Sequence, residues 1–236
     1  MADGPRFAIY FVPAAETALY RFGAAVLGYD CYTGETTARP RDAGLTEAEW
    51  AALTAEPRTY GFHATLKAPF RLRDEFDQSD LLAETKSLAS SIAAIPTFEP
   101  AVGLIGGFVA ILPRTTSPAL DRLAADCVTG FERFRSPLTA PERARRLAAG
   151  LSPRQTANLE RFGYPYVFDD FRFHMTLAGQ IEPDRRAAIH LLLQNEFVRL
   201  HGLRPVQIDQ LALVRQDHPD EAFRVIGRAS LRNGAG

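Results

Sequence analysis

The sequence is short of cysteine, of long apolar runs and of any excess of one charge, and each shortage excludes a class of protein. Its 236 residues include two cysteines, Cys31 and Cys127, which are too few for a disulfide framework or a four-cysteine zinc site. No segment approaches the roughly 18 consecutive apolar residues of a membrane-spanning helix. Residues 1–6 lack the pattern of a signal peptide. We therefore expect a cytoplasmic protein with reduced thiols and no membrane partner.

The charges are balanced, with 27 lysines and arginines against 28 aspartates and glutamates and a net charge of −1. A protein that binds the backbone of long DNA or RNA usually carries a basic excess, so we expect no long nucleic acid as a partner. A few local cations are still enough to bind a small phosphorylated metabolite. Glycine-rich phosphate-binding loops are also absent, because Gly103 and the pair Gly106-Gly107 are typical of turns.

The spacing of apolar residues divides the chain into strands and helices of ordinary length. Thr46 followed by Glu49 is typical of a helix that begins with a capping box. The two glycines at 106–107, between two apolar runs, predict a hairpin. We expect strands at 7–12, 60–70, 98–104, 108–112, 170–177, 206–215 and 223–231. We expect helices at 16–27, 45–55, 79–94, 117–134, 183–197 and, as two short pieces, within 141–162.

Both halves of this pattern run through a strand, a helix and a hairpin, which predicts an α+β fold. With 236 residues, 46% of them hydrophobic, the chain suits one domain built from two related lobes. We expect the first lobe at about 1–113 and the second at about 114–236, each an antiparallel sheet backed by helices, with a central cleft. The pattern leaves open whether the lobes exchange strands, and we expect a monomer.

One motif occurs twice, at Tyr60–Leu66 (YGFHATL) and at Phe171–Leu177 (FRFHMTL). Both copies read aromatic-x-Phe-His-x-Thr-Leu, and their histidines, His63 and His174, lie 111 residues apart. A single His-x-Ser/Thr is weak evidence, because about 0.5 copies are expected by chance in a chain of this composition. Two copies in the same frame, one in each half, indicate an internal repeat.

Strand geometry gives this repeat a chemical meaning. Side chains alternate between the faces of a strand, so His63 and Thr65 share one face and His174 and Thr176 share one face, while the apolar residues between them point to the core. If the two lobes pack around a pseudo-twofold axis, both pairs face one cleft. Two imidazoles there can act as base and acid in one turnover, and each hydroxyl can donate to a phosphoryl oxygen.

These residues resemble the two-histidine (2H) phosphoesterase superfamily, which includes the LigT-like RNA 2′,3′-cyclic phosphodiesterases, also called 2′-5′ RNA ligases. The strings FAIYFVP at 7–13, YGFHATLKAPFRL at 60–72 and FRFHMTL at 171–177 are further similar to the branch associated with phosphonate metabolism in carbon–phosphorus lyase gene clusters. The resemblance implies the LigT-like fold and a metal-independent phosphodiesterase. It also implies a cyclic phosphate of a small sugar or nucleotide as substrate, and no cofactor.

Carried over to this chain, one of His63 and His174 would activate water or a hydroxyl and the other would protonate the leaving alkoxide. The sequence does not say which histidine has which role. Thr65 and Thr176 would hold the phosphoryl oxygens and stabilise the charge of the transition state. The alternative is that both histidines are ordinary strand residues and both threonines are simple β-formers.

Four further residues are candidates for binding the substrate or its phosphate. By alternation Arg172 and Lys67 lie on the same faces as the motif histidines, where either can neutralise a phosphate; solvated charges at strand ends are the alternative. Tyr10 on the first strand can line the cleft or pack in the core. Tyr166, with Tyr164, precedes the second motif and can stack on a base or sugar, or simply pack within its loop.

The remaining histidines form no pattern of metal ligands, and a zinc site at the two motif histidines would need further ligands, so we expect no metal. The basic run at 143–146 is a solvated helix face or a docking surface for an anion. Two other functions stay open. One is an RNA 2′,3′-cyclic-end phosphodiesterase or ligase-like enzyme, and the other is a module that binds a phosphorylated metabolite without turnover.

Overall fold

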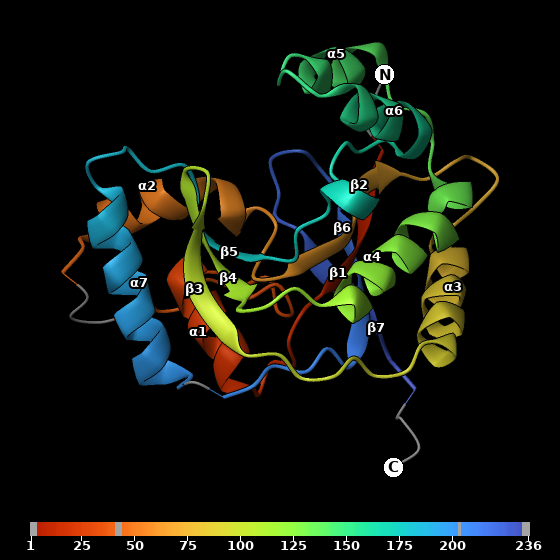
Figure 1. Ribbon diagram of the computed structural model, residues 1–236. Coiled ribbons are helices and arrows are strands. Elements are labelled where there is room, and N and C mark those ends of the chain that lie inside the picture. The colour runs from red at the N-terminus through yellow and green to blue at the C-terminus, as the bar shows by residue number, and fades with distance from the viewer. Residues whose placement is uncertain (1–3, 41–43, 203, 233–236) are drawn as a thin grey trace.

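The computed structural model describes residues 4–40, 44–202 and 204–232. Within it, seven strands form one antiparallel sheet in the order β3-β4-β5-β2-β1-β6-β7 (Figure 1). The strands are β1 Arg6–Phe11, β2 Ala64–Arg71, β3 Pro100–Ile105, β4 Phe108–Pro113, β5 Met175–Ala178, β6 Gln210–Gln216 and β7 Arg224–Ser230.

Helices cover the two ends of this sheet as separate groups. α7 packs on β3, and α1 and α2 pack on β5, whereas α3 packs on β6 and β7 and α4 packs on β2. The described residues hold seven α-helices, of which none has the length and apolar character of a membrane-spanning segment. Their bounds are α1 Ala18–Leu27, α2 Glu47–Arg58, α3 Gln78–Ser91, α4 Pro118–Gly130, α5 Ala140–Leu147, α6 Pro153–Phe162 and α7 Arg186–Leu200.

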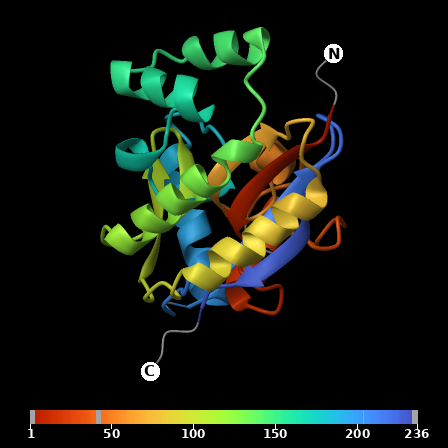
Figure 2. The same ribbon diagram turned by 90° about the vertical axis from the view of Figure 1, so that its right-hand side faces the viewer.

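Helices α5 and α6 form a pair that stands away from the sheet, beyond the end of β2 (Figures 1 and 2). Each begins with a capping box, Thr139 with Glu142 for α5 and Ser152 with Gln155 for α6. The exposed ion pair of Arg143 and Glu160 joins the two helices. The expected division of 141–162 into two short helices is confirmed.

Several predicted element ends are also confirmed because their local chemistry is decisive. Thr46 caps α2 by accepting from the backbone of Glu49, whose side chain accepts in return from the Thr46 backbone. α1 ends at Gly28, which adopts the left-handed conformation with φ 65°. The hairpin of β3 and β4 turns at Gly106, where φ is 57°.

Three predicted strands begin four or more residues later than expected. β2 starts at Ala64 instead of residue 60, β5 at Met175 instead of residue 170 and β6 at Gln210 instead of residue 206. Gly61 has a left-handed φ of 71°, and residues 168–170 form a turn of 3₁₀ helix, so neither approach to the motif can pair in the sheet. His63 and His174 therefore each lie one residue before a strand.

Strands of both halves of the chain lie at both ends of the sheet. β5 of the second half pairs with β4, and β6 of the second half pairs with β1. The element order repeats from β1 to β3 and from β4 to β6, and the third strand of each repeat pairs with the first strand of the other. In this sheet the first repeat ends at the turn between β3 and β4.

Candidate functional site

The two copies of the motif meet in the middle of the sheet. β2 and β5 are neighbours through a single residue pair, Ala64 with Met175. Both of these side chains are buried, so the residues on either side of them point to the other face. One residue further along this antiparallel register, His63 lies opposite Thr176 and His174 lies opposite Thr65.

His63, Thr65, His174 and Thr176 line one cavity with a volume of about 500 Å³, called the histidine cavity below. All four side chains are partly exposed, whereas the apolar motif residues between and beside them are buried. The alternation inferred from the sequence therefore holds at these positions even though the histidines precede their strands. The fold brings the two motifs to one cavity, as their repetition predicts.

Both imidazoles are held by the same local hydrogen bond. Nδ1 of His63 lies 2.8 Å from the carbonyl oxygen of Gly61, and Nδ1 of His174 lies 2.7 Å from the carbonyl oxygen of Arg172. A carbonyl oxygen only accepts, so each Nδ1 carries the proton and donates it. In the neutral ring, Nε2 is then the free acceptor, and that of His63 lies 2.9 Å from Oγ1 of Thr65.

Burial keeps both imidazoles neutral near pH 7. It lowers the pKa of His63 to about 4, against a raising effect of the Gly61 carbonyl and with a further lowering effect from the charge of His174. It also lowers the pKa of His174, against the raising effect of the Arg172 carbonyl. The charge effect of His174 on His63 shows that a proton on one ring disfavours a second proton on His63.

The backbone that orients His63 depends on a glycine. Gly61 has a left-handed φ of 71°, and a Cβ at this position would lie 2.7 Å from Cβ of Cys31. A larger residue would strain the turn and displace its carbonyl, which fixes the tautomer of His63. The YGFH segment therefore requires glycine at position 61, which the prediction of a strand from residue 60 did not include.

Tyr10 lies beneath one of the two histidines. Its ring stacks on the imidazole of His63 with 3.8 Å between the ring centroids, and Tyr10 pairs with Thr65 across β1 and β2. The side chain lines the histidine cavity but is 1% exposed, and its hydroxyl is buried without a hydrogen-bond partner in the described structure. Tyr10 therefore offers its ring, and not its hydroxyl, to the site.

Lys67 does not reach the histidine cavity, contrary to the expectation from alternation. The register of β1 against β2 slips by one residue between Thr65 and Lys67, and this bulge turns Lys67 to the face opposite Thr65. Its side chain is 3% exposed, with Nζ 2.6 Å from the Glu132 carboxylate and 3.1 Å from the Val128 carbonyl oxygen. Lys67 is a buried ion-pair residue.

Arg172 and Tyr166 also lie outside the histidine cavity. Residue 172 precedes β5, so strand alternation does not apply to it, and the exposed Arg172 side chain donates back to the carbonyl oxygens of Asp169 and Phe171. Tyr166 is 43% exposed and its ring contacts that of Tyr164 edge-on. Both residues line a neighbouring pocket that also reaches His174.

The site contains cations and aromatic rings that sequence reasoning did not assign to it. Arg6 enters from the start of β1 and Arg145 and Arg146 enter from α5. The basic run at 143–146 gave a weak signal for two of these residues, but nothing local distinguished Arg6. The unassigned aromatic side chains that line the histidine cavity are Tyr60 and Phe108, beside Tyr10 and Tyr164, which the sequence analysis had named.

The donors in this cavity suit phosphate oxygens. They are the hydroxyls of Thr65 and Thr176 and three guanidinium groups, set against the single carboxylate of Glu56 among the described lining residues. Across residues 4–40, 44–202 and 204–232, no three His, Cys, Asp or Glu side chains gather in an arrangement that would hold a metal ion. The arrangement can bind a phosphate ester and transfer protons at it.

Comparison with known proteins places the chain in a family. Residues 65–224 match the model of DUF1045, described as a protein family of unknown function. The chain belongs to this family. It is also 35% identical over 221 residues to a ribose 1,5-bisphosphate phosphokinase PhnN of Janthinobacterium sp. (strain Marseille), covering 92% of this chain and 49% of that protein. The chain spans about half the length of the curated relatives it matches.

Two solved structures are similar over nearly the whole chain. The protein TT0787 of Thermus thermophilus has a TM-score of 0.45 and 18% identity, with 97% of this chain and 98% of that chain covered. LigT of Escherichia coli, solved with NADP+, has a TM-score of 0.41 and 13% identity, with 98% and 99% covered.

Proposed function

We propose that this DUF1045 chain is a 2H-type phosphodiesterase that hydrolyses a cyclic phosphodiester of a small phosphorylated sugar or nucleotide, without a metal or cofactor. One observation carries the proposal. Two His-x-Thr motifs, each with its histidine Nδ1 bonded to the carbonyl two residues earlier, line one cavity. If the two histidines had only a structural role, the fold would not need to orient both imidazoles in the same way towards the histidine cavity.

In the proposed reaction, one imidazole accepts a proton from water through Nε2 as the water oxygen attacks phosphorus. The other imidazole, protonated on Nε2, gives its proton to the leaving sugar oxygen as the phosphorus–oxygen bond breaks. The products are a phosphate monoester and a hydroxyl group, so a proton passes from one histidine to the other in each turnover. Thr65 and Thr176 donate to the non-bridging oxygens, where negative charge grows in the transition state.

His63 is the better candidate for the base. Burial lowers its pKa to about 4, so it is neutral near pH 7 and ready to accept a proton. Nε2 of His63 accepts from the hydroxyl of Thr65, and it becomes free to accept a proton from water when that hydroxyl turns to a phosphoryl oxygen of the substrate. His174 then supplies the proton to the leaving group.

The size of the cavity and the relatives support a small substrate. A volume of about 500 Å³ is typical of pockets for single small molecules. The relative from Janthinobacterium is named for ribose 1,5-bisphosphate, which supports a phosphorylated ribose as the substrate class and phosphonate metabolism as the setting. We do not extend the kinase activity to this chain, because its sequence has no Gly-x-x-x-x-Gly-Lys-Ser/Thr loop.

The test is turnover of a panel of cyclic phosphates by EDTA-treated protein, followed by phosphorus NMR. The panel holds nucleoside 2′,3′-cyclic phosphates, a ribose 1,2-cyclic phosphate and an RNA oligomer with a 2′,3′-cyclic end. We expect hydrolysis of one of the small members to a phosphate monoester. A preference for the oligomer that weakens steeply with salt would instead favour an RNA-end enzyme. Tight binding without hydrolysis would favour a binding module.

A further inference from the structure

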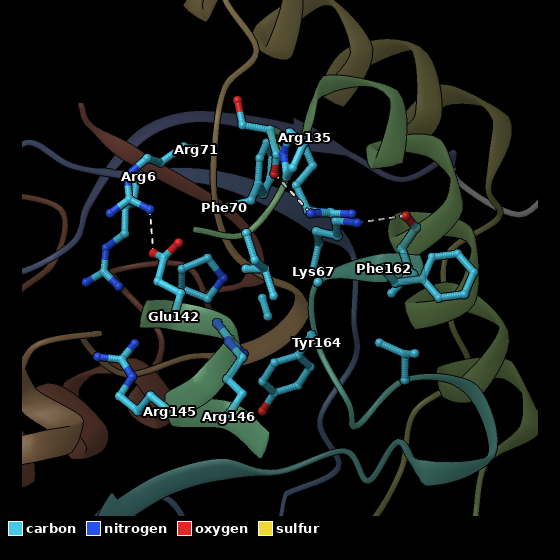
Figure 3. A pocket seen from close by; sticks show the side chains of 18 residues that line it. Arg6, Lys67, Phe70, Arg71, Arg135, Glu142, Arg145, Arg146, Phe162 and Tyr164 are labelled. Atoms are coloured by element: carbon cyan, nitrogen blue, oxygen red, sulfur yellow. Dashed lines mark hydrogen bonds and ion pairs between the residues drawn. The ribbon is translucent and has the colours of Figure 1, made fainter. Parts of the chain in front are cut away.

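A second, strongly basic hollow adjoins the histidine cavity (Figure 3). Cationic side chains from β1, β2, α5 and the turn after α4 line it: Arg6, Lys67, Arg71, Arg135, Arg145 and Arg146. Among the described residues that line it, Glu142 is the one carboxylate. None of the four motif residues lines this basic hollow, so it is a separate space from the proposed reaction centre.

Half of these cations have carboxylate partners. Lys67 and Arg135 share Glu132, each with a nitrogen–oxygen distance of 2.6 Å, and Arg71 pairs with Glu142. These ion pairs fix the walls of the hollow.

The other three cations have no carboxylate partner in the described part of the chain. Arg6 donates from Nε to the side-chain oxygen of Gln216, a neutral acceptor, at 2.7 Å. Arg145 is exposed and makes no ion pair there. The guanidinium carbon of Arg146 lies 5.3 Å from the ring centroid of Tyr164, its Nε is buried without a hydrogen-bond partner, and burial lowers its pKa. A cation desolvated in this way is costly unless an anion meets it.

These three arginines line both the basic hollow and the histidine cavity, so they lie at the boundary between the two spaces. The histidine cavity also adjoins a more apolar pocket, which shares Thr65 and His174 with it but none of the three arginines. The arginines thus line the part of the cavity that opens to the basic hollow, which none of the four motif residues lines. An anion bound in that part can be a different group from the phosphodiester held between the histidines.

We propose that Arg6, Arg145 and Arg146 bind a second anionic group of the substrate, a phosphate monoester on the same sugar as the cyclic phosphodiester. This inference rests on the proposed function and makes it narrower, because a cyclic phosphate with no second phosphate leaves three cations unpaired. Two of the three come from α5, so the helix pair of α5 and α6 is the part of the fold that selects the doubly phosphorylated substrate.

The test compares a nucleoside 2′,3′-cyclic phosphate with the same compound carrying a 5′-phosphate. We expect kcat/KM of the wild type to be at least about tenfold higher for the 5′-phosphorylated substrate, because charged hydrogen bonds to phosphate are lost without it. The Arg145→Gln/Arg146→Gln double variant should reduce kcat/KM for that substrate by about 10–100-fold. Its loss of kcat/KM on the unphosphorylated substrate should be at least about tenfold smaller, so that the preference for the 5′-phosphorylated substrate is lost.

Arg143→Gln is the matched control, since Arg143 is on the same helix, carries the same charge and pairs with Glu160 outside both spaces. It should keep the wild-type preference. The inference would be overturned if the ratio of kcat/KM for the 5′-phosphorylated and the unphosphorylated substrate were the same in the wild type, the double variant and the control. Circular dichroism checks that each variant is folded.

A binding measurement separates this inference from the proposed function. Calorimetric titration with ribose 5-phosphate needs no turnover, and we expect binding to the wild type and to His63→Ala. Binding should be at least about tenfold weaker in the double arginine variant. If no cyclic phosphate is hydrolysed, the proposed function fails while this titration still decides the subsite. Equal affinity of all variants, or no binding to the wild type, would overturn the subsite.

Discussion

At the scale of single residues, the environment of the two histidines determines what they can do. Each ring is oriented by a backbone carbonyl, which leaves Nε2 to face the histidine cavity. Burial acts in the same direction on both, because it lowers the pKa of His63 to about 4 and also lowers that of His174. Hydrogen bonding thus sets the tautomer, and desolvation favours the neutral form.

This environment predicts an acidic pH optimum. Hydrolysis requires one neutral and one protonated imidazole, so kcat/KM of the free enzyme falls when both rings are protonated and when both are neutral. The acid limb should lie near the His63 pKa of about 4. The alkaline limb should have an apparent pKa below the ordinary His value of about 6.5. A profile of kcat/KM from pH 3 to 9 measures both limbs, and an alkaline limb above about pH 7.5 would contradict this assignment.

The predictability of the site from sequence also differs residue by residue. The motif residues can be recognised because they repeat within short strings. Lys67 was misplaced because a single bulge in β2 reverses the side-chain alternation on which its assignment rested. Arg6 gave no local signal, since its place beside α5 depends on how segments about 140 residues apart in sequence pack.

At the scale of elements, one carboxylate holds α5 in position. Glu142 accepts from the backbone and hydroxyl of Thr139 as the capping box of α5, and it also pairs with Arg71 at the end of β2. Burial raises the pKa of Glu142, but the hydrogen bonds from Arg71 and Thr139 outweigh it and hold the value at about 2. The helix that carries Arg145 and Arg146 is therefore attached to the sheet through Glu142.

Removing this charge should loosen α5 specifically. We expect Glu142→Gln to lower the hydrogen-exchange protection of residues 140–147 by about tenfold at pH 7, whereas the matched control Glu160→Gln should change it little. In the wild type the contribution of Glu142 is fully present above its unfolded pKa of about 4.5 and is lost as pH falls towards 2. Protection in α5 that is unchanged in Glu142→Gln would contradict this attachment.

The element ends that the sequence predicted well are those with local chemistry, such as the capping box at Thr46 and the glycine turn at Gly106. The starts of β2 and β5 were predicted too early, because strand-like residues precede both motifs. Only the positive φ of Gly61 and the 3₁₀ turn at 168–170 stop those residues from pairing. A side chain at position 61 would collide with Cys31, which is distant in sequence.

At the scale of the whole molecule, the exchange of strands ties the two repeats together. β1 needs β6 as a partner and β4 needs both β3 and β5, so neither repeat completes its own part of the sheet. Among the described residues, the part of the sheet made of β3, β4 and β5 meets the part made of β2, β1, β6 and β7 in one residue pair, Ala64 with Met175. The proposed reaction centre therefore exists only when both repeats are folded and exchanged, which no local sequence pattern could reveal.

Cutting the chain in the turn between β3 and β4 tests this interdependence. We expect fragments 1–106 and 107–236, expressed separately, to lack cooperative thermal unfolding, because each has strands without their partners. Expressed together, they should form a complex with the circular dichroism spectrum of the intact chain. A fragment that unfolds cooperatively alone would show that the repeats fold independently.

The most direct test of the account is the activity of the His63→Ala and His174→Ala variants on the cyclic phosphate that the wild type prefers, measured in EDTA. His190→Ala is the control, since His190 lies on α7 and contacts the Val102 carbonyl oxygen at 3.1 Å, outside the histidine cavity. We predict that each motif variant stays folded and loses about 10²–10⁴-fold in kcat/KM, while the control keeps wild-type activity. A folded double variant of His63 and His174 that retains full activity would contradict the account.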